Sequence, residues 1–299
     1  MKRYPLTLFD AFTEVAFGGS QAAVITAAAT ISNAQRRQIA REIGMPATAF
    51  VDDHGEDWVQ AQFMSTVMEL PMCGHGTLCL FTQLLESGVL QADREVELRL
   101  PRSNANVSLS TTATGRYRVM LEVQAPSFVA APAEIDELPA LLGLDAAALS
   151  TTLPVEIARG DFIHLVVPLS GLAEMRRISP DFSAMIRFCQ RHGIETIAVF
   201  CLVTEHPAMH LHVRDFCPAV GVSESAAAGT TNAALSGYLL RHALVATDSS
   251  AITINAEQGL ELGRPSSIQS QLELDDNGKI RRLQVGGVAT RVFQGEIIL

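Results

Sequence analysis

The chain has 299 residues, of which 48% are hydrophobic and 18% charged, enough apolar material for one large domain or two ordinary ones. Its net charge is −10, and its 20 Arg and two Lys are spread along the sequence, which argues against a nucleic-acid partner. No apolar run is long enough to cross a bilayer, residues 1–10 lack a signal-peptide core, and five cysteines without a CxxC pair fit reduced thiols. These features predict a cytoplasmic protein with no membrane partner.

The first half of the chain reads as short strands around one peripheral helix. Ser32, with Gln35 three positions later, forms the pattern of a capping box, and Gly44 is placed to end the helix. Alternating apolar residues predict strands, because successive side chains of a strand point to opposite faces. The expected strands cover residues 4–12, 22–25, 48–52, 58–64, 96–100, 107–109 and 117–123.

Residues 68–77, MELPMCGHGT, are the stretch with the clearest chemistry. Apolar residues at helical spacing follow them, so a buried helix should start near His75 and end near Gly88. The first N–H groups of a helix have no partner inside it, and the helix dipole adds positive charge there. Such a start can hold a carboxylate and lower the pKa of a thiol such as that of Cys73.

An Ala/Pro-rich crossing at residues 124–132 marks the expected domain boundary, giving halves of about 1–124 and 125–285. The last strand, 293–299, is expected to return to the first half, so that about 286–299 completes it. Helices are expected at 136–142, 145–149 and 180–192. The strands predicted for this half cover residues 155–158, 162–168, 195–203, 210–216, 252–255, 259–262, 268–274 and 280–285.

The second half repeats the pattern of the first. Residues 223–231, SESAAAGTT, form a second small-residue turn that opens a second buried helix. If both helix starts face a cleft between the halves, they make a two-sided anion site of the kind in which small ligands are bound. The nucleotide and zinc patterns GxGxxG, GxxxxGK[ST] and HExxH are absent from the sequence.

Five stretches together resemble the phenazine-biosynthesis PhzF-like family of the diaminopimelate-epimerase-like superfamily. They are FDAF (9–12), FGG (17–19), IARE (39–42), ELPMCGH (69–75) and GLELGRPS (259–266). The resemblance implies an α+β fold of two pseudo-symmetric halves, each a curved, barrel-like sheet around a central helix. It also implies an active site between the halves, a homodimer, and proton transfer beside a carboxylate without a metal or organic cofactor.

The departures from this family concern its proton carriers. The catalytic glutamate of the isomerase members corresponds to Ala47, and the aspartate of their E-D-P-x-T-G-S motif corresponds to Ser225. The racemase branch of the superfamily has one cysteine at each helix start. Cys73 fits the first of these positions, whereas Ala227 or Ala228 fills the second.

Two hypotheses follow. In the first, the chain is a cofactor-independent isomerase or epimerase of a small amino-acid-like carboxylate. Cys73 then acts as thiolate in a one-base mechanism, or His75 is instead the acid that returns the proton. In the second, it binds such a carboxylate without turnover. The residues expected to hold the substrate are Gly74, Gly76, Glu224, Ser225, Gly229 and Thr230. Glu69 fits a site role or a solvated strand end equally well.

Overall fold

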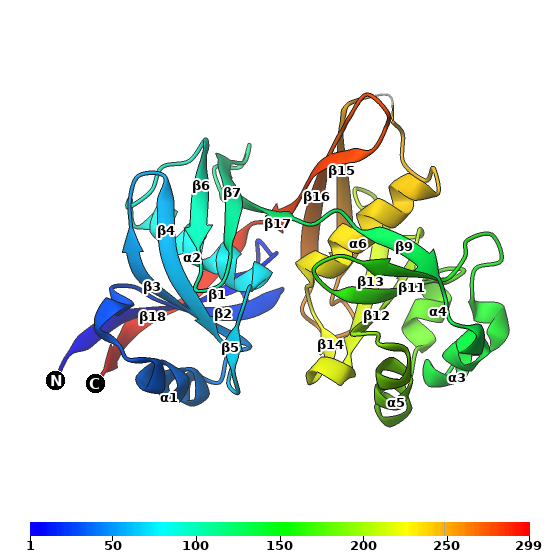
Figure 1. Ribbon diagram of the computed structural model, residues 1–299, viewed down its shortest axis with the longest axis horizontal. Coiled ribbons are helices and arrows are strands. Elements are labelled where there is room, and N and C mark those ends of the chain that lie inside the picture. Colours follow the sequence, from blue (N-terminus) through cyan, green and yellow to red (C-terminus); the bar gives the residue numbers. More distant parts are fainter. Residues whose placement is uncertain (248) are drawn as a thin grey trace. The chain divides into compact units, whose positions relative to one another are not determined.

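The computed structural model describes residues 1–247 and 249–299, and the chain divides into two compact units (Figure 1). Unit 1 consists of Met1–Glu122 with Gly286–Leu299, and unit 2 of Val123–Val285. Both have an α+β architecture in which a sheet packs against one central helix, as the sequence predicts.

The elements of unit 1 follow in chain order. They are β1 (Arg3–Ala11), β2 (Ser20–Ile25), η1 (Ala28–Thr30), α1 (Asn33–Ile43), β3 (Ala47–His54), β4 (Trp58–Met64), β5 (Glu69–Leu70), α2 (Gly74–Glu86), β6 (Arg94–Arg99), β7 (Asn104–Thr111), β8 (Tyr117–Val123, whose last residue belongs to unit 2) and β18 (Ala289–Ile298).

The elements of unit 2 follow in the same way. They are β9 (Ser127–Ala130), η2 (Ala133–Glu137), α3 (Leu138–Leu141), η3 (Ala146–Ala148), β10 (Glu156–Arg159), β11 (Ile163–Pro168), α4 (Leu172–Arg177), α5 (Phe182–His192), β12 (Thr196–Cys201), β13 (Leu211–Cys217), η4 (Pro218–Val220), β14 (Val222–Ser225), α6 (Gly229–Arg241), β15 (Ala251–Gln258), β16 (Ser266–Leu274) and β17 (Ile280–Gly287, which ends in unit 1).

The two units share one pattern of strand pairing. In unit 1, β1–β2 is antiparallel, β2–β3 parallel, β3–β4 antiparallel, β4–β6 parallel and β6–β7 antiparallel. In unit 2, β10–β11, β11–β12, β12–β13, β13–β15 and β15–β16 repeat these directions in order. The short strand β5 runs antiparallel to β4, and the short strand β14 runs antiparallel to β13. The repeat that the sequence shows only as a pattern is therefore a repeat of topology.

In each unit, the first strand of the repeated pattern also pairs with a strand that follows the other repeat in the sequence. β9 pairs antiparallel with β10 in unit 2, and β18 pairs antiparallel with β1 in unit 1. The last strand thus pairs with the first strand of the chain, with Arg3 opposite Ile298 and Ala11 opposite Ala289.

The helices α2 and α6 are central because they are buried on nearly all sides, which is the mark of a core helix. In α2, the run from Gly76 to Thr82 is buried without interruption, and in α6 the run from Thr231 to Leu239 is. Figure 1 shows α2 lying among the strands of unit 1 and α6 among those of unit 2. The remaining helices lie outside, and α1 has the predicted Ser32–Gln35 capping box and ends at Gly44.

The structure differs from the sequence prediction at residues 259–262, in the crossing at 124–132 and in α4, among other places. Residues 259–262, expected as a strand, form a turn in which Arg264 N donates to Gly259 O (3.0 Å). Gly259 has a φ of +76°, and a Cβ atom there would lie 2.5 Å from Ala226 O, so only glycine fits. The crossing at 124–132 contains β9, and α4 was not predicted.

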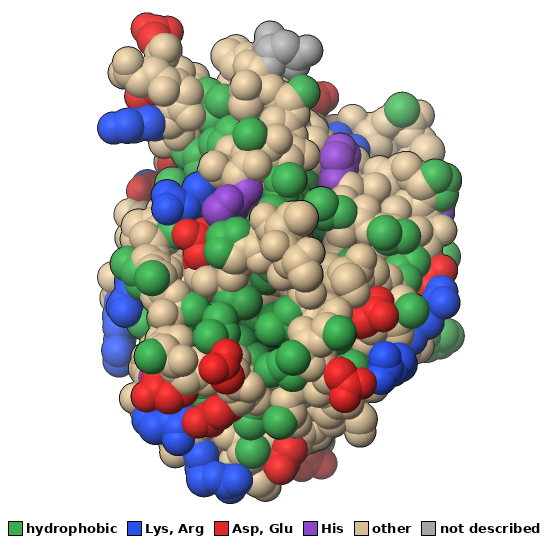
Figure 2. Space-filling model, turned by 90° about the vertical axis from the view of Figure 1, so that its right-hand side faces the viewer, with side chains coloured by type: hydrophobic (Ala, Val, Ile, Leu, Met, Phe, Trp, Pro, Cys, Tyr) green, Lys and Arg blue, Asp and Glu red, His purple; other side chains and the backbone are tan. Residues whose placement is uncertain are grey.

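Lys and Arg side chains are interspersed with Asp and Glu side chains on the face drawn in Figure 2. Within the described ranges 1–247 and 249–299, the helices are too short or too polar to cross a membrane.

Candidate active site

The first candidate half-site is the start of α2. Cys73 is the extended residue directly before the helix, and its backbone carbonyl accepts hydrogen bonds from Thr77 N (2.9 Å) and Thr77 Oγ1 (2.8 Å). The Cys73 Sγ atom lies 3.6 Å from both ring nitrogens of His75. The structure therefore brings together the thiol and the imidazole that the sequence singles out.

The protonation states of this pair differ from the expectation for a helix start. Burial raises the pKa of the Cys73 thiol to about 12, and the Gly76 N–H opposes that rise only in part. Burial also lowers the pKa of His75 to about 4. The expectation of a thiolate that is already formed is therefore wrong for the free protein, because desolvation outweighs the helix dipole. At neutral pH the pair consists of a thiol and a neutral imidazole.

The two glycines around His75 have different roles. A Cβ atom on Gly76 would lie 3.0 Å from the Phe63 ring and 3.1 Å from Cys73 Sγ, so a side chain there would push on the thiol. A Cβ atom on Gly74 would meet nothing within 4 Å. Gly76 is thus needed for the close packing under the helix start, whereas Gly74 leaves open space beside it.

The second candidate half-site is the start of α6, and it answers the question of which alanine matches Cys73. Ala228 precedes α6 with φ −130° and ψ 107°, and Cys73 precedes α2 with φ −150° and ψ 104°. Both helices have 13 residues. Ala228 therefore stands where Cys73 stands, and Ala227 is a buried residue beside it.

Hydrogen bonds hold the carbonyl groups of the turn before α6. Gln258 Nε2 donates to Ser225 O (2.8 Å), and Ser225 Oγ donates to Ala227 O (3.2 Å). Ser266 Oγ, at the end of the GLELGRPS stretch, donates to Ala226 O in this turn. Neither helix start has a side-chain cap in the described part of the chain, and the first N–H groups of α6, at Gly229 and Thr230, have no carbonyl partner within the helix.

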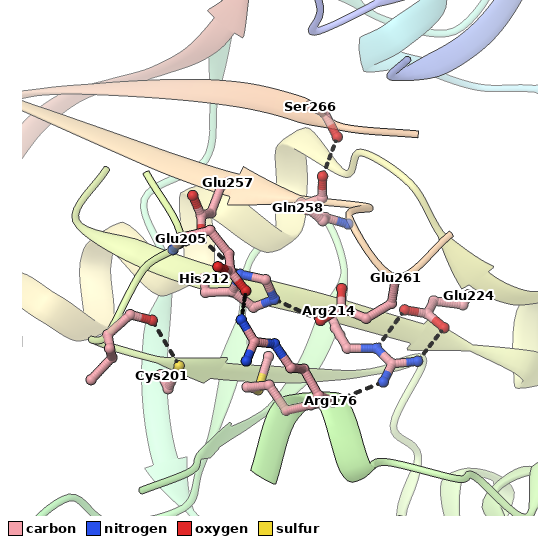
Figure 3. A network of polar contacts seen from close by, with 12 residues as sticks. Arg176, Cys201, Glu205, His212, Arg214, Glu224, Glu257, Gln258, Glu261 and Ser266 are labelled. Atoms are coloured by element: carbon pink, nitrogen blue, oxygen red, sulfur yellow. Dashed lines mark hydrogen bonds and ion pairs between the residues drawn. The ribbon is translucent and has the colours of Figure 1, made fainter. Parts of the chain in front are cut away.

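Glu224, which the sequence places among the substrate-binding residues, is held in a buried ion pair. Its carboxylate receives two hydrogen bonds from Arg214, at 2.8 and 2.9 Å (Figure 3). Both side chains are at least nine-tenths buried, and Arg214 Nη1 also donates to Met175 O (2.9 Å). Such a bidentate pair positions the turn before α6 and occupies one acceptor site on each Glu224 oxygen.

His212 forms a second buried ionic contact in the same network (Figure 3). Its Nδ1 atom lies 2.8 Å from Glu257 and its Nε2 atom 2.9 Å from Glu261. Burial by itself would lower the pKa of His212, but the hydrogen bonds and charges of the two glutamates raise it above its ordinary value. This contact joins β13 and β15 to the 259–263 turn.

The remaining residues of the family motifs and the candidate Glu69 lie in the following environments. Ala47, where the family glutamate would stand, is fully buried at the start of β3. Asp10 accepts a hydrogen bond from Phe17 N (2.7 Å) and holds the glycine turn. Glu69 lines a cavity of about 800 Å³ in unit 1 together with Arg36 and Arg99. In the described part of the chain, no cluster of three His, Cys, Asp or Glu side chains could hold a metal ion.

One polar cluster was missed by sequence reasoning. Asp215, His164, Thr196 and Thr231 meet beneath the start of α6, all buried. The available signal was an acidic residue in the buried strand 210–216, but its partners come from three other elements that the sequence does not place beside it.

Comparison with known proteins places this geometry in a family. The family model described as phenazine biosynthesis-like protein, PhzC-PhzF, matches residues 9–295. The uncharacterized isomerase YddE of Escherichia coli K12 is 25% identical, with 96% of each chain covered. The trans-2,3-dihydro-3-hydroxyanthranilate isomerase of Pseudomonas chlororaphis is 26% identical, with 98% of each chain covered.

The fold shows the same likeness. The crystal structure of the Bacillus anthracis phenazine biosynthesis protein of the PhzF family matches with a TM-score of 0.90 and 21% identity, covering all of both chains. This confirms the predicted fold class of two barrel-like α+β halves. The chain belongs to the phenazine biosynthesis-like (PhzC-PhzF) protein family.

Proposed function

We propose that this protein is an isomerase or epimerase that moves a proton at the carbon next to the carboxylate of a small amino-acid-like metabolite, using its own side chains as acid and base. Full-length relatives that are named isomerases support the reaction class. The observation that carries the proposal is the contact of 3.6 Å between Cys73 Sγ and the His75 ring at an uncapped helix start.

The proton transfers balance between the Cys73 thiol and the His75 imidazole. The thiol gives its proton to the imidazole, which forms a thiolate and an imidazolium. The thiolate then removes the proton from the substrate carbon, and the imidazolium returns a proton to the substrate, which restores the thiol and the neutral imidazole. Burial disfavours each charge alone, but the two charges form together in contact and stabilise each other.

The negative charge that develops on the substrate carboxylate needs hydrogen-bond donors. The free N–H groups at a helix start supply them without reorganisation, and the helix dipole adds to the stabilisation. The start of α2 and the start of α6 both have such groups. That the two starts serve one ligand stays a prediction, and so does the homodimer.

The second candidate function is carboxylate binding without turnover. Specific observations favour it: Ala47, Ser225 and Ala228 stand where relatives of this superfamily are expected to carry acid–base groups. The two functions differ in one measurable property, the exchange of a substrate proton with solvent.

The test is deuterium wash-in from D₂O, followed by NMR. The panel contains amino acids, hydroxyprolines and trans-2,3-dihydro-3-hydroxyanthranilate, and the proteins are wild type, Cys73→Ala, His75→Ala and the control Cys79→Ala, which removes another buried thiol of α2. Wild type and control should exchange, and Cys73→Ala should lose on the order of 10² to 10⁴ in rate.

Two other outcomes are informative. Exchange that survives in Cys73→Ala and disappears in His75→Ala would make His75 the base. Binding of the carboxylates by wild type without any exchange across the panel would establish the binding function instead.

A further inference from the structure

The cluster beneath the start of α6 centres on a carboxyl group that is not fully paired. Asp215 is 2% exposed and receives hydrogen bonds from the hydroxyls of Thr231 and Thr196. Its Oδ1 atom has no hydrogen-bond partner among residues 1–247 and 249–299. Because a buried polar atom without a partner costs free energy, this arrangement calls for a reason beyond packing.

His164 extends the cluster. Its Nδ1 atom lies 2.6 Å from Thr196 Oγ1 and 3.5 Å from Thr231 Oγ1, so each hydroxyl bridges the imidazole and the carboxyl group. Burial lowers the pKa of His164 to about 4, so the ring is neutral at physiological pH.

The equivalent place in unit 1 shows that the fold does not need these polar groups. Ala198 pairs with Asp215 in unit 2 as Ala49 pairs with Phe63 in unit 1. Thr231 is the third residue of α6, as Gly76 is of α2, and the Phe63 ring packs onto Gly76. By the same strand register, His164 and Thr196 stand where unit 1 has Ala22 and Ala47. An apolar contact fills this place in unit 1, and an acid with three polar partners fills it in unit 2.

The register also places Asp215 beside the position of the family aspartate. Asp215 lies directly opposite Ser225 in the β13–β14 pair, and directly opposite residues of an antiparallel pair project to the same face. The sequence lacks a carboxyl group at residue 225, and the structure supplies one on the facing strand, under the first turn of α6.

The charges around Asp215 favour its protonated form. Burial raises its pKa to about 7, the two threonine hydroxyls oppose this, and Glu224 on β14 adds to the rise. Glu224 is itself paired with Arg214, His164 on β11 is neutral, and burial keeps the pKa of Cys217 on β13 far above its ordinary range. Among the titratable groups named here, Asp215 is therefore the one whose pKa lies near neutral pH.

We propose that binding of a carboxylate at the start of α6 is coupled to the uptake of one proton by Asp215. The proposal rests on the proposed function in taking the α6 start as a carboxylate site. An ionised Asp215 beneath the first turn already offers the helix dipole a negative charge and repels a second anion, whereas a protonated Asp215 does neither. Ligand and proton therefore favour each other, as linkage requires.

This coupling fixes the pH dependence of binding. Below the pKa of Asp215 the site is already protonated, so affinity does not change with pH. Between this pKa and the higher pKa of the ligand-bound protein, up to one proton is taken up for each carboxylate bound, so affinity falls by up to about tenfold for each pH unit. Asp215→Asn mimics the protonated carboxyl group, so its affinity should stay at the low-pH value throughout.

The experiment follows the Asp215 carboxyl carbon by ¹³C NMR in protein labelled at aspartate, with the signal assigned by its loss in Asp215→Asn. The titration is run with sodium chloride and again with sodium acetate at equal ionic strength. We expect a pKa well above the ordinary aspartate range, raised further by acetate. Thr231→Val, which removes one hydroxyl donor, should raise it even without acetate. Asp276→Asn, at an exposed turn of unit 2, is the control.

Each result decides the proposal. A pKa in the ordinary range, or one that acetate leaves unchanged, overturns it, as does an Asp215→Asn variant whose acetate affinity still falls with pH. These results are separable from the test of function, because they require no turnover: loss of proton exchange in Cys73→Ala leaves them unaffected.

Discussion

Cys73 and Ala228 occupy the same place in the two units, each as the extended residue directly before a 13-residue central helix. One place has a thiol and the other only a methyl group. In the reaction proposed above, the thiol at the start of α2 therefore has no thiol counterpart at the start of α6, and its partner is His75, which is in contact with it.

The first prediction concerns the reactivity of Cys73 in the free protein. Because burial raises its pKa to about 12, the thiolate fraction is small at neutral pH and grows with every increase in pH. The rate of alkylation by iodoacetamide, followed by mass spectrometry of the peptide that contains Cys73, should rise steadily to pH 9. A plateau near pH 7 would show a thiolate that is already formed and would contradict the prediction.

The second prediction compares the two glycines of α2. Gly76→Ala should destabilise unit 1 by about 1–3 kcal/mol, because its Cβ atom would crowd Phe63 and Cys73 Sγ. Gly74→Ala, whose Cβ atom enters open space, should be neutral or stabilising by up to about 1 kcal/mol. Urea unfolding followed by the fluorescence of Trp58, which lies in unit 1, measures both. Equal effects of the two substitutions would contradict the packing argument.

The third prediction tests whether the ion pair between Glu224 and Arg214 stabilises the fold. Each of Glu224→Gln and Arg214→Gln leaves a buried charge unpaired and should cost about 3–5 kcal/mol. The double variant should be less destabilised than the sum of the two, because it removes both charges. The cycle is measured by urea unfolding followed by circular dichroism. Additive effects would mean that the two side chains do not stabilise each other, and would contradict a structural role of the Glu224–Arg214 pair.

The fourth prediction concerns the pH dependence of unit 2. The folded pKa of His212 lies above the ordinary 6.5, so its stabilising contribution is complete below that pH and is lost as pH rises through the folded pKa. The pKa of Glu261 is held below 4.5 by His212 despite its burial, so its contribution is complete above pH 4.5 and is lost as pH falls. This contact should therefore stabilise unit 2 most between about pH 4.5 and 6.5.

The variant His212→Gln should lose this pH dependence and about 3–5 kcal/mol, because Glu257 and Glu261 would be left buried and unpaired. Urea unfolding between pH 5 and 9, followed by circular dichroism, measures it, with Trp58 fluorescence as the reference for unit 1. A difference between wild type and variant that stays constant over this range would refute the proposed titration.

Local sequence rules were sufficient where the structure depends on neighbouring residues. The capping box of Ser32 and Gln35 follows from two side chains three positions apart, and residues 58–64 form a strand with the predicted limits. The small-residue turns likewise lead into helices, since α2 begins at Gly74 and α6 at Gly229.

The rules failed where distant segments decide the outcome. The turn at residue 259 depends on the carbonyl of Ala226, and the pairing of Glu224 depends on an arginine ten residues away on another strand. The pKa of Cys73 depends on what buries it, which no local pattern contains. Asp215 was overlooked because its partners belong to β11, β12 and α6, and only the register of the sheet brings them together.

The pairing of β18 with β1 has a consequence for biosynthesis. Ribosomes deliver β1 among the first residues and β18, Ala289–Ile298, only at the other end of this sequence. Until then, one edge of β1 has unpaired backbone N–H and C=O groups, and such edges pair readily with other chains. All the strands of unit 2 emerge in the meantime and can pair among themselves. A nascent chain stalled before residue 289 should therefore be a preferred chaperone client and an aggregation risk.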